Sequence, residues 1–318
     1  MIKVGFIGAG DIAYLHGEGV QASSNAQLHG IWNRTRAKAE EKASLFDTRV
    51  FDTAEELIEA VDVVYVLTNM ETHYAYCMQA IEAGKHVLVE KPTAVTIEEI
   101  EEVKAFAHQK GVQVAPVHNY IYEAPVMRAK ELIESGKLGD LVSLHVLYNI
   151  HHPEEVAARY PGVIRQILTH HAYCTLYLVG QPELVSCMKA TVNDGSVPQE
   201  NLAMVTMKMR NQALSHLCAS FAADDHAGDP WTFMIKVIGT KGATRYSYRD
   251  WVENTPAVVH SQTYSAYPYT IRSVGQYFLE QVIGNKRPPL SSLDDAITCL
   301  KIIEACEQSV EEQRHIPI

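Results

Sequence analysis

The chain has 318 residues with 27 basic and 38 acidic side chains, which gives a formal net charge of −11. This balance argues against a nucleic-acid or anionic-membrane partner, because such surfaces need clustered Lys and Arg. The six cysteines show no C-x-x-C spacing, which suggests neither a zinc site nor a disulfide framework and favours a reduced, cytoplasmic protein. No apolar stretch approaches the ~18 residues of a membrane span, and we expect no secretory signal.

Apolar runs alternate with helical segments from residue 1 to about residue 120. Thr53 and Thr96 each begin a capping box, with Glu three residues later, and so mark two of the helix starts. This rhythm predicts strands buried on both faces of a doubly wound parallel sheet. The runs are Val4–Ile7, Leu28–Trp32, Val61–Leu67, Val87–Val89 and Val112–Val117.

The turn between the first predicted strand and the first helix reads G-A-G-D-I-A at residues 8–13. Gly8 permits a tight turn, Gly10 lets the backbone approach a pyrophosphate, and Asp11 and Ile12 open the helix whose N-terminus attracts that anion. Ala13 allows close packing of helix on strand. The position of this motif predicts an N-terminal dinucleotide-binding domain of the Rossmann type.

Beyond residue 120 the strands follow one another with fewer helices between them. This order predicts an α+β domain with an open, mainly antiparallel sheet. We expect a dinucleotide-binding domain at 1–121 and a domain for substrate binding and oligomerisation at 122–318, with the last helix packing back on the first domain. The expected strands are Leu141–Tyr148, Val185–Val192, Leu202–Met209, Leu214–Phe221 and Phe233–Ile238, and the helices are Val126–Ser135, Gln166–Val179, Ile271–Ile283 and Leu293–Glu312. The last helix begins with a capping-box variant at Ser292, with Asp295 in place of Glu.

The end of the second predicted strand distinguishes the two nicotinamide cofactors. An acidic residue there holds the adenosine ribose of NAD, but this chain has Asn33, followed by Arg34, Thr35 and Arg36. Two guanidinium groups and a hydroxyl suit a 2′-phosphate, which favours NADP over NAD. Asn33 could still bond a ribose hydroxyl, and the arginines could be ordinary surface residues.

Residues 83–92 read A-G-K-H-V-L-V-E-K-P, and residues 68–73 read T-N-M-E-T-H. With the N-terminal glycines, these stretches resemble the Gfo/Idh/MocA oxidoreductase family over nearly the whole chain. The resemblance implies NAD(H) or NADP(H), a sugar, cyclitol or related polyol as substrate, and cofactor contacts from Thr68, Asn69, His73, Glu90 and Lys91.

The resemblance also implies that Lys91 lies between nicotinamide and substrate. An ammonium there stabilises the alkoxide charge that develops when a carbinol loses hydride. Relatives often have a cis bond in the E-K-P turn, so we expect one between Lys91 and Pro92. Glu90 would orient Lys91 or contact the cofactor.

Family members commonly place Asp-x-x-x-His on the helix that interrupts the second sheet. Here the matching residues are Gln166 and His170. His170 would accept the alcohol proton, while Gln166 hydrogen-bonds a hydroxyl but supplies no charge. A structural histidine in the domain interface is the alternative for His170. The neighbouring Arg165 and His171 should point to other sides of the helix.

Aromatic and imidazole side chains suit carbohydrate recognition because they combine stacking with hydrogen bonds. The substrate-binding candidates, besides Lys91, Gln166 and His170, are Tyr120, Tyr122, His151 and Trp231. No H-x-x-x-H or paired carboxylate spacing indicates a metal site.

Three functions agree with these residues. The favoured one is an NAD(P)-dependent oxidoreductase acting on a sugar, glycoside or cyclitol. The missing Asp at Gln166 motivates a non-catalytic NAD(P)-sensing regulator, and a glycosidase with transient oxidation by bound NAD is the third. We also expect a homodimer or homotetramer formed through the exposed face of the second-domain sheet.

Overall fold

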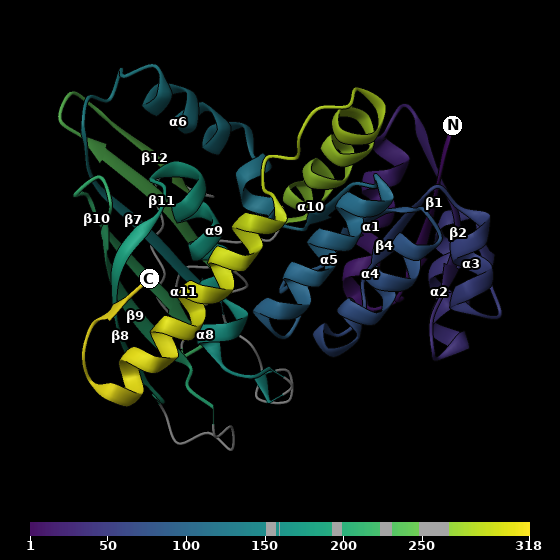
Figure 1. Ribbon diagram of the computed structural model, residues 1–318, viewed down its shortest axis with the longest axis horizontal. Helices are drawn as coiled ribbons and strands as arrows, with labels where there is room; N and C mark the ends of the chain where they lie inside the picture. The colour runs from purple at the N-terminus through teal and green to yellow at the C-terminus, as the bar shows by residue number, and fades with distance from the viewer. Residues whose placement is uncertain (151–156, 159, 193–198, 223–230, 248–266) are drawn as a thin grey trace, which may run out of the picture. The chain divides into compact units, whose positions relative to one another are not determined.

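The computed structural model describes residues 1–150, 157–158, 160–192, 199–222, 231–247 and 267–318 (Figure 1). Two compact units emerge, one formed by residues 1–122 and 268–297, the other by residues 123–267 and 298–318. The sequence analysis placed the division after residue 121, and the first segment of the first unit ends at residue 122. The return of residues 268–297 to the first unit was not anticipated, because only the last helix was expected to pack there.

The first unit contains a six-stranded parallel sheet in the order β3-β2-β1-β4-β5-β6. This confirms the doubly wound expectation. Its strands are β1 (Ile2–Ile7), β2 (Ala26–Trp32), β3 (Arg49–Val50), β4 (Val63–Val66), β5 (His86–Val89) and β6 (Val114–Pro116). Only β3 was missed, since two residues carry no periodicity.

Helices cover this sheet in two groups. Helix α1 packs with α2, while α3 and α5 each pack with α4. Because crossovers between parallel strands are right-handed, the reversal of strand order between β1 and β4 puts the two groups on opposite faces. The helices of this segment are α1 (Asp11–Ala22), α2 (Arg36–Phe46), α3 (Ala54–Ala60), η1 (Met70–Thr72), α4 (His73–Glu82), α5 (Ile97–Lys110) and η2 (Asn119–Tyr122).

The predicted helix start signals are present in the structure. The Thr96 side chain accepts from the Glu99 N–H while Glu99 reaches back, so this capping box is complete. Thr53 makes its half of the box with Glu56. Ser292 and Asp295 form the third box with Asp in place of Glu.

The helical segment after residue 267 joins α1. It consists of α10 (Tyr267–Gln276) and the π-helical η4 (Tyr277–Gly284), where one regular helix was expected at 271–283. Gln276 donates to the Ala22 carbonyl at the end of α1, and Asn25 donates to the Leu279 carbonyl. These contacts explain why the segment belongs to the first unit.

The second unit contains a seven-stranded sheet in the order β12-β11-β7-β10-β9-β8-β13. Every pairing is antiparallel except β10 with β7, which confirms an open, mainly antiparallel sheet. The short β12 and β13 were not predicted. The strands are β7 (Leu141–Ile150), β8 (Pro182–Ala190), β9 (Leu202–Met209), β10 (Leu214–Ser220), β11 (Trp231–Gly239), β12 (Ala243–Ser247) and β13 (Ile316–Pro317).

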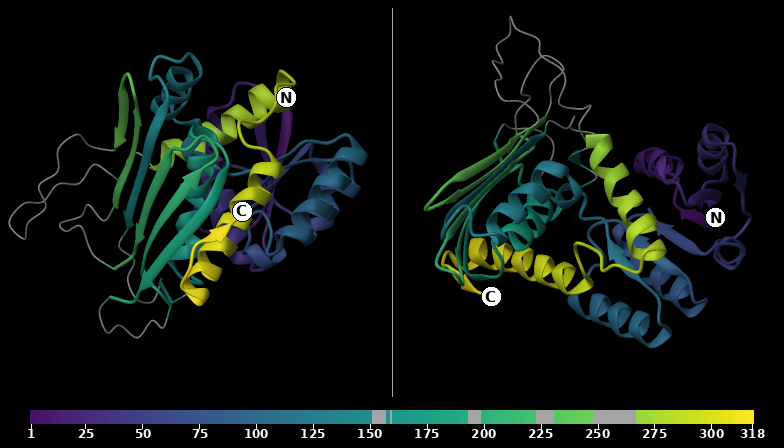
Figure 2. Two further views of the ribbon diagram at one scale, coloured as in Figure 1. Left: turned by 60° about the vertical axis from the view of Figure 1, so that its left-hand side comes forward. Right: turned by 90° about the horizontal axis from the view of Figure 1, so that it is seen from above.

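Helices of the second unit lie on one face of this sheet, as Figure 2 shows. They are α6 (Ala124–Glu134), α8 (Val163–Gln166), α9 (Leu168–Leu178) and most of α11 (Leu293–Glu312). The side chains on this face are buried, among them Val146, Tyr148 and Phe233. Leu214, Met204 and Met188 lie on the opposite face and are 53%, 47% and 78% exposed.

The expected helix at 166–179 is interrupted. Ile167 has φ of −105° and separates α8 from α9, and the His170 N–H bonds the Ile167 carbonyl three residues back. Gln166 and His170 therefore belong to two successive helices, where one continuous helix was expected.

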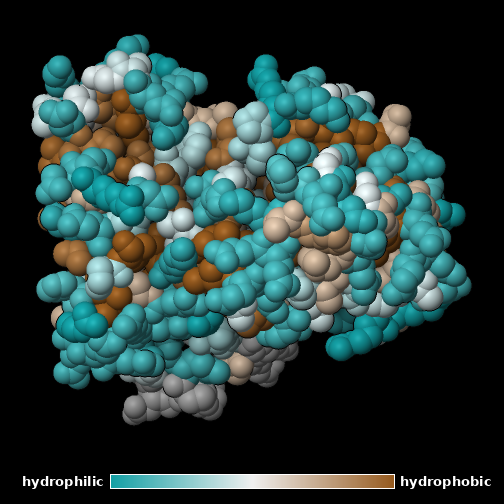
Figure 3. Space-filling model, viewed as in Figure 1, coloured by the Kyte–Doolittle hydropathy of each residue, from teal (hydrophilic) through white to brown (hydrophobic). Residues whose placement is uncertain are grey.

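No helix in the described part of the chain is long and apolar enough to cross a bilayer. The face seen in Figure 3 is largely hydrophilic, with separate apolar patches. Within the described ranges, no three His, Cys, Asp or Glu side chains gather in a way that could hold a metal ion.

Candidate functional site

A pocket of about 260 Å³ lies where β1, β2 and β4 end at the reversal of strand order. Ligands in doubly wound sheets bind at this place. Its lining includes seven of the predicted cofactor residues, namely Gly8, Gly10, Asn33, Arg34, Thr35, Thr68 and Asn69. It also includes Ala9, Trp32, Lys38, Leu67, Thr72 and Tyr76, which the sequence analysis did not single out.

The two glycines of the first turn serve different needs. Gly8 has φ of +114°, and a Cβ there would lie 2.6 Å from the Leu67 carbonyl oxygen, so the fold itself requires glycine. A Cβ on Gly10 would meet no protein atom within 4 Å. Gly10 is the N-cap residue of α1 and has no side chain to cap it. The open space over a helix N-terminus fits the pyrophosphate of a dinucleotide.

Asn33 connects the glycine turn to the end of β2. Its Oδ1 accepts from the Ala9 N–H at 3.1 Å, and its Nδ2 donates to the Thr35 carbonyl at 2.9 Å. The side chain therefore stabilises the pocket wall. An aspartate here would bring a negative charge into a pocket whose described lining has none.

Two cationic side chains line the pocket, but they are not the two arginines that the sequence predicted. Arg34 and Lys38 belong to the lining. Arg36 instead bonds Glu40 through Nε at 2.8 Å and Asp52 through Nη1. The Arg36 guanidinium therefore pairs with the carboxylates of Glu40 and Asp52, which do not line the pocket. Lys38 was missed because a lysine in the first turns of a helix resembles any solvated residue.

Aromatic rings form another part of the wall. Trp32 and Tyr76 meet edge to face, with ring centroids 5.7 Å apart. Such rings offer an apolar surface to a purine. The position of Trp32, as the last residue of a predicted strand before Asn33, was a signal that could have identified it.

The turn after β5 carries Lys91, and the peptide bond between Lys91 and Pro92 is cis, which confirms the expectation. Lys91 is partly buried, and burial lowers its pKa to about 8, against the opposing charge of Glu90. Glu90 accepts from the Lys91 backbone N–H at 3.1 Å and bonds His16 Nε2 at 2.9 Å. An amine with this pKa can gain or lose a proton near neutral pH.

Several other predicted residues lie outside the pocket lining. His73 is 1% exposed, and its ring nitrogens lie 2.8 Å from the Pro92 carbonyl and 2.9 Å from the Thr68 carbonyl. Asp11 and Ile12 lie in the first turn of α1. Tyr120 is fully buried, and Tyr122 packs edge-on against Tyr277 at 5.3 Å.

In the second unit, α9 brings two adjacent histidines against the sheet. His170 is 3% exposed, its Nδ1 lies 2.7 Å from the Tyr173 hydroxyl, and its ring meets Tyr148 edge-on. His171 is fully buried between the Ile167 and Cys218 carbonyls, and burial lowers its pKa to about 4. His171 is therefore a neutral structural residue.

The remaining candidates flank this region. Gln166 is the last residue of α8. Arg165 forms a bidentate pair with Glu307, at 2.7 Å for both contacts, and so anchors α8 to α11. His151 lies outside the described residues, and Trp231 begins β11 without a described side chain.

Two family models match most of the chain. Residues 2–118 match an oxidoreductase family with an NAD-binding Rossmann fold, and residues 126–245 match the GFO/IDH/MocA C-terminal domain. The N-terminal and the C-terminal parts of the chain therefore both match models of the family that the sequence resembles.

Curated relatives include two from Bacillus subtilis. The chain is 34% identical over 195 residues to scyllo-inositol 2-dehydrogenase (NADP(+)), an alignment that covers 58% of this chain and 54% of that protein. It is 26% identical over 263 residues to glucose-6-phosphate 3-dehydrogenase, with coverage of 77% and 74%. The first alignment thus spans about half the length of that relative.

A solved structure of scyllo-inositol dehydrogenase from Lactobacillus casei, with bound NAD(H) and scyllo-inositol, superposes with a TM-score of 0.86. It covers 100% of this chain and 99% of that one at 18% identity. This likeness shows that the fold is shared.

Proposed function

This chain belongs to the Gfo/Idh/MocA family of oxidoreductases, and we propose that it is an NAD(P)-dependent dehydrogenase of a sugar, glycoside or cyclitol. The observation that carries the proposal is the pocket at the strand-order reversal, with Gly10 open above the N-terminus of α1. Relatives named as inositol and sugar-phosphate dehydrogenases support the substrate class.

In this proposal the chain holds the dinucleotide through its backbone and a few side chains. The N-terminus of α1 would bind the pyrophosphate, Trp32 and Tyr76 would offer an apolar surface to the adenine, and Thr68 and Asn69 would contact the dinucleotide at the end of β4. The bound nicotinamide supplies the hydride acceptor or donor.

Lys91 and His170 are assigned to the reacting carbon. The Lys91 ammonium would stabilise the alkoxide oxygen while hydride leaves, and the partly buried position strengthens that interaction. His170 would take the hydroxyl proton. In this proposal Nε2 of His170 takes the proton, and the contact of Nδ1 with the Tyr173 hydroxyl supports that choice. Gln166 would hydrogen-bond a neighbouring substrate hydroxyl.

We further propose that NADP is preferred over NAD. Arg34 and Lys38 line the pocket, and the described lining holds no carboxylate. Two cations suit a 2′-phosphate, whereas discrimination for NAD usually rests on an acidic residue at the ribose. The NADP(+) named for the scyllo-inositol relative points the same way.

We also propose a homodimer or homotetramer formed through the face of the seven-stranded sheet that carries Leu214, Met204 and Met188. Exposed apolar side chains on neighbouring strands mark an interaction surface. The small-molecule substrate is otherwise the expected partner.

The test is a turnover screen of cyclitols, sugars and sugar phosphates with each cofactor, read by the absorbance of reduced nicotinamide. A dehydrogenase accumulates reduced or oxidised cofactor in step with product. A glycosidase would release sugar without net cofactor change, and a regulator would bind cofactor without either. Cofactor binding without net redox turnover on the whole panel would overturn the proposal.

A further inference from the structure

Two buried histidines hold the Glu90-Lys91-Pro92 turn from different elements. His16 of α1 bonds Glu90 Oε1 at 2.9 Å, and Glu90 Oε2 accepts from the Lys91 N–H at 3.1 Å. His73 of α4 instead contacts the Pro92 carbonyl. One histidine therefore meets a carboxylate, and the other meets main chain only.

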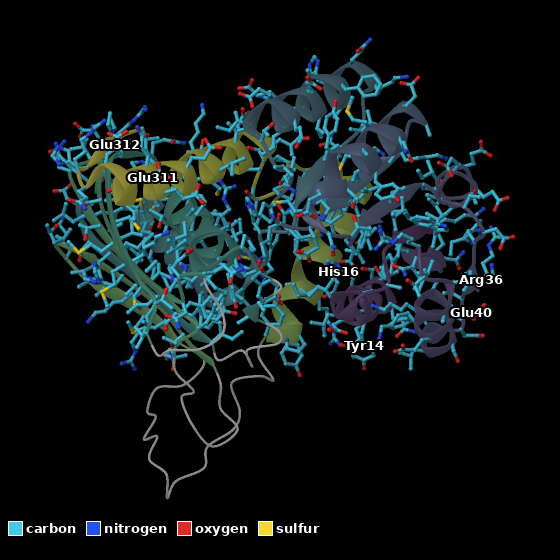
Figure 4. The ribbon with its side chains drawn as sticks, turned by 90° about the horizontal axis from the view of Figure 1, so that it is seen from below. Tyr14, His16, Arg36, Glu40, Glu311 and Glu312 are labelled. Carbon is cyan, nitrogen blue, oxygen red and sulfur yellow. The ribbon has the colours of Figure 1, made fainter. Side chains whose placement is uncertain are left out.

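His16 is surrounded by apolar and aromatic groups, and the polar contact that its side chain makes is with Glu90. Figure 4 shows it on α1 turned inward from the exposed Tyr14, and it is 1% exposed. Its ring meets Tyr65 and Phe6 edge-on, and within the described ranges its Nδ1 has no hydrogen-bond partner. An apolar side chain would avoid the cost of that unpaired nitrogen. The bond to Glu90 is the contact that an apolar residue could not make.

Glu90 is a carboxylate in a poorly solvated place, with its side chain 13% exposed. Burial acts to raise its pKa, but the hydrogen bond and attraction of His16, followed by the charge and N–H of Lys91, hold that pKa below its ordinary value. His16 thus favours the ionised carboxylate beside Lys91.

The other titratable groups around the turn do not replace this carboxylate. His118 is buried, and burial and the Lys91 charge lower its pKa to about 3. Burial raises the pKa of Tyr65 and keeps it neutral. Among the described residues, Glu90 is the group whose charge raises the Lys91 pKa.

We propose that His16 and Glu90 act as a positioning pair for Lys91, in which His16 holds Glu90 in place and ionised, and Glu90 keeps the Lys91 amine protonated. The inference rests on the proposed function only for the use that Lys91 makes of its proton. The contacts among His16, Glu90 and Lys91 exist in the protein without cofactor or substrate, and can be tested there.

The direct test is the titration of the Lys91 amine in the cofactor-free protein, followed by NMR with isotope-labelled lysine. Loss of the signal in Lys91→Arg assigns it. Loss of the Glu90 charge leaves burial unopposed, so Glu90→Gln should lower the titration midpoint by about one pH unit or more. His16→Leu, which removes the hydrogen bond to Glu90, should move it in the same direction, whereas His16→Gln, which can still hydrogen-bond Glu90, should leave it nearly unchanged.

His73→Gln is the matched control, because His73 is as buried as His16 and touches the same turn. Its variant should leave the Lys91 midpoint unchanged. An unshifted midpoint in Glu90→Gln, or an equal shift in His73→Gln, would overturn the pairing. Thermal melts identify variants that fail to fold, and Glu90→Asp, which keeps the charge, should then restore folding and a midpoint above that of any folded uncharged variant.

Kinetics supply a second readout where a substrate is known. The alkaline limb of kcat should move to lower pH in Glu90→Gln and His16→Leu, with a smaller change in the cofactor KM. If the turnover screen fails while the NMR midpoint shifts, the positioning pair stands and the dehydrogenase proposal falls.

Discussion

The cofactor pocket of the six-stranded unit and the α9 region of the seven-stranded unit present polar groups in different ways. Gly8, Gly10 and Thr68 line the pocket, which lies at the strand-order reversal beside the N-terminus of α1. Helix α9 instead buries two histidines against the sheet. Main-chain sites depend on local spacing, whereas the role of a buried side chain depends on what the rest of the fold brings to it.

The strongest test of this contrast separates chemistry from cofactor binding at Lys91. Lys91→Ala should lower kcat on the order of 10²-fold or more, because a charge at the reacting oxygen is lost. The Kd for the dinucleotide should change little, since backbone amides near Gly10 hold the pyrophosphate. Steady-state kinetics and fluorescence titration measure the two effects. A large loss of cofactor affinity with unchanged turnover per bound enzyme would refute the assignment.

The two glycines of the first turn should fail in opposite ways. Gly8→Ala should destabilise the protein by roughly 3 kcal/mol, because positive φ and the nearby Leu67 carbonyl both oppose a side chain. Gly10→Ala should cost about 1 kcal/mol or less in stability but weaken dinucleotide binding strongly. Urea denaturation and cofactor titration distinguish them. Equal cofactor affinity in Gly10→Ala and wild type would show that the pyrophosphate lies elsewhere.

In the second unit, His171 should make stability depend on pH. Its folded pKa of about 4 lies below the ordinary 6.5, so the unfolded chain binds the proton more tightly between these values. The stability of the folded state is full above pH 6.5 and falls by about 3 kcal/mol as the pH approaches 4. His171→Phe removes this titration. Denaturant unfolding across this pH range should show a shallower decline in the variant, and identical slopes would contradict the neutral structural role.

The preference for NADP over NAD should depend on the cationic side chains that line the pocket, Arg34 and Lys38, and not on Arg36. Arg34→Ala and Lys38→Ala should each weaken NADP by about tenfold while changing NAD affinity little, because a charge contact to phosphate is worth roughly 1–2 kcal/mol. Arg36→Ala is the control, since Arg36 pairs with Glu40 and Asp52 outside the pocket. Equal losses for NAD and NADP would remove the 2′-phosphate role.

The smallest effect on catalysis is expected at the exposed sheet face. Met204→Lys should raise the monomer fraction measured by light scattering at micromolar concentration, because a charge would be buried in the proposed interface. Leu45→Lys is the control, as Leu45 is 56% exposed on α2 of the other unit. A wild-type protein that is already monomeric would contradict the oligomer.

The amino-acid sequence by itself determined the elements that depend on near neighbours in the chain. The capping boxes at Thr96 and Ser292 result from hydrogen bonds within a few residues, and the G-x-G turn and the apolar runs of the parallel strands are recognisable as short patterns along the chain. The family pattern around residues 83–92 also predicted the cis bond at Lys91. Such features need no knowledge of distant contacts.

Tertiary structure alone decided which side chains face each other. Arg36 and Lys38 are two residues apart on α2, but Arg36 forms an ion pair with Asp52 while Lys38 lines the pocket. His16 meets Glu90 across 74 positions of sequence. The return of η4 to α1 has the same cause. These partners are set by long-range packing, because a side chain's role follows from the groups that the fold brings within hydrogen-bond distance.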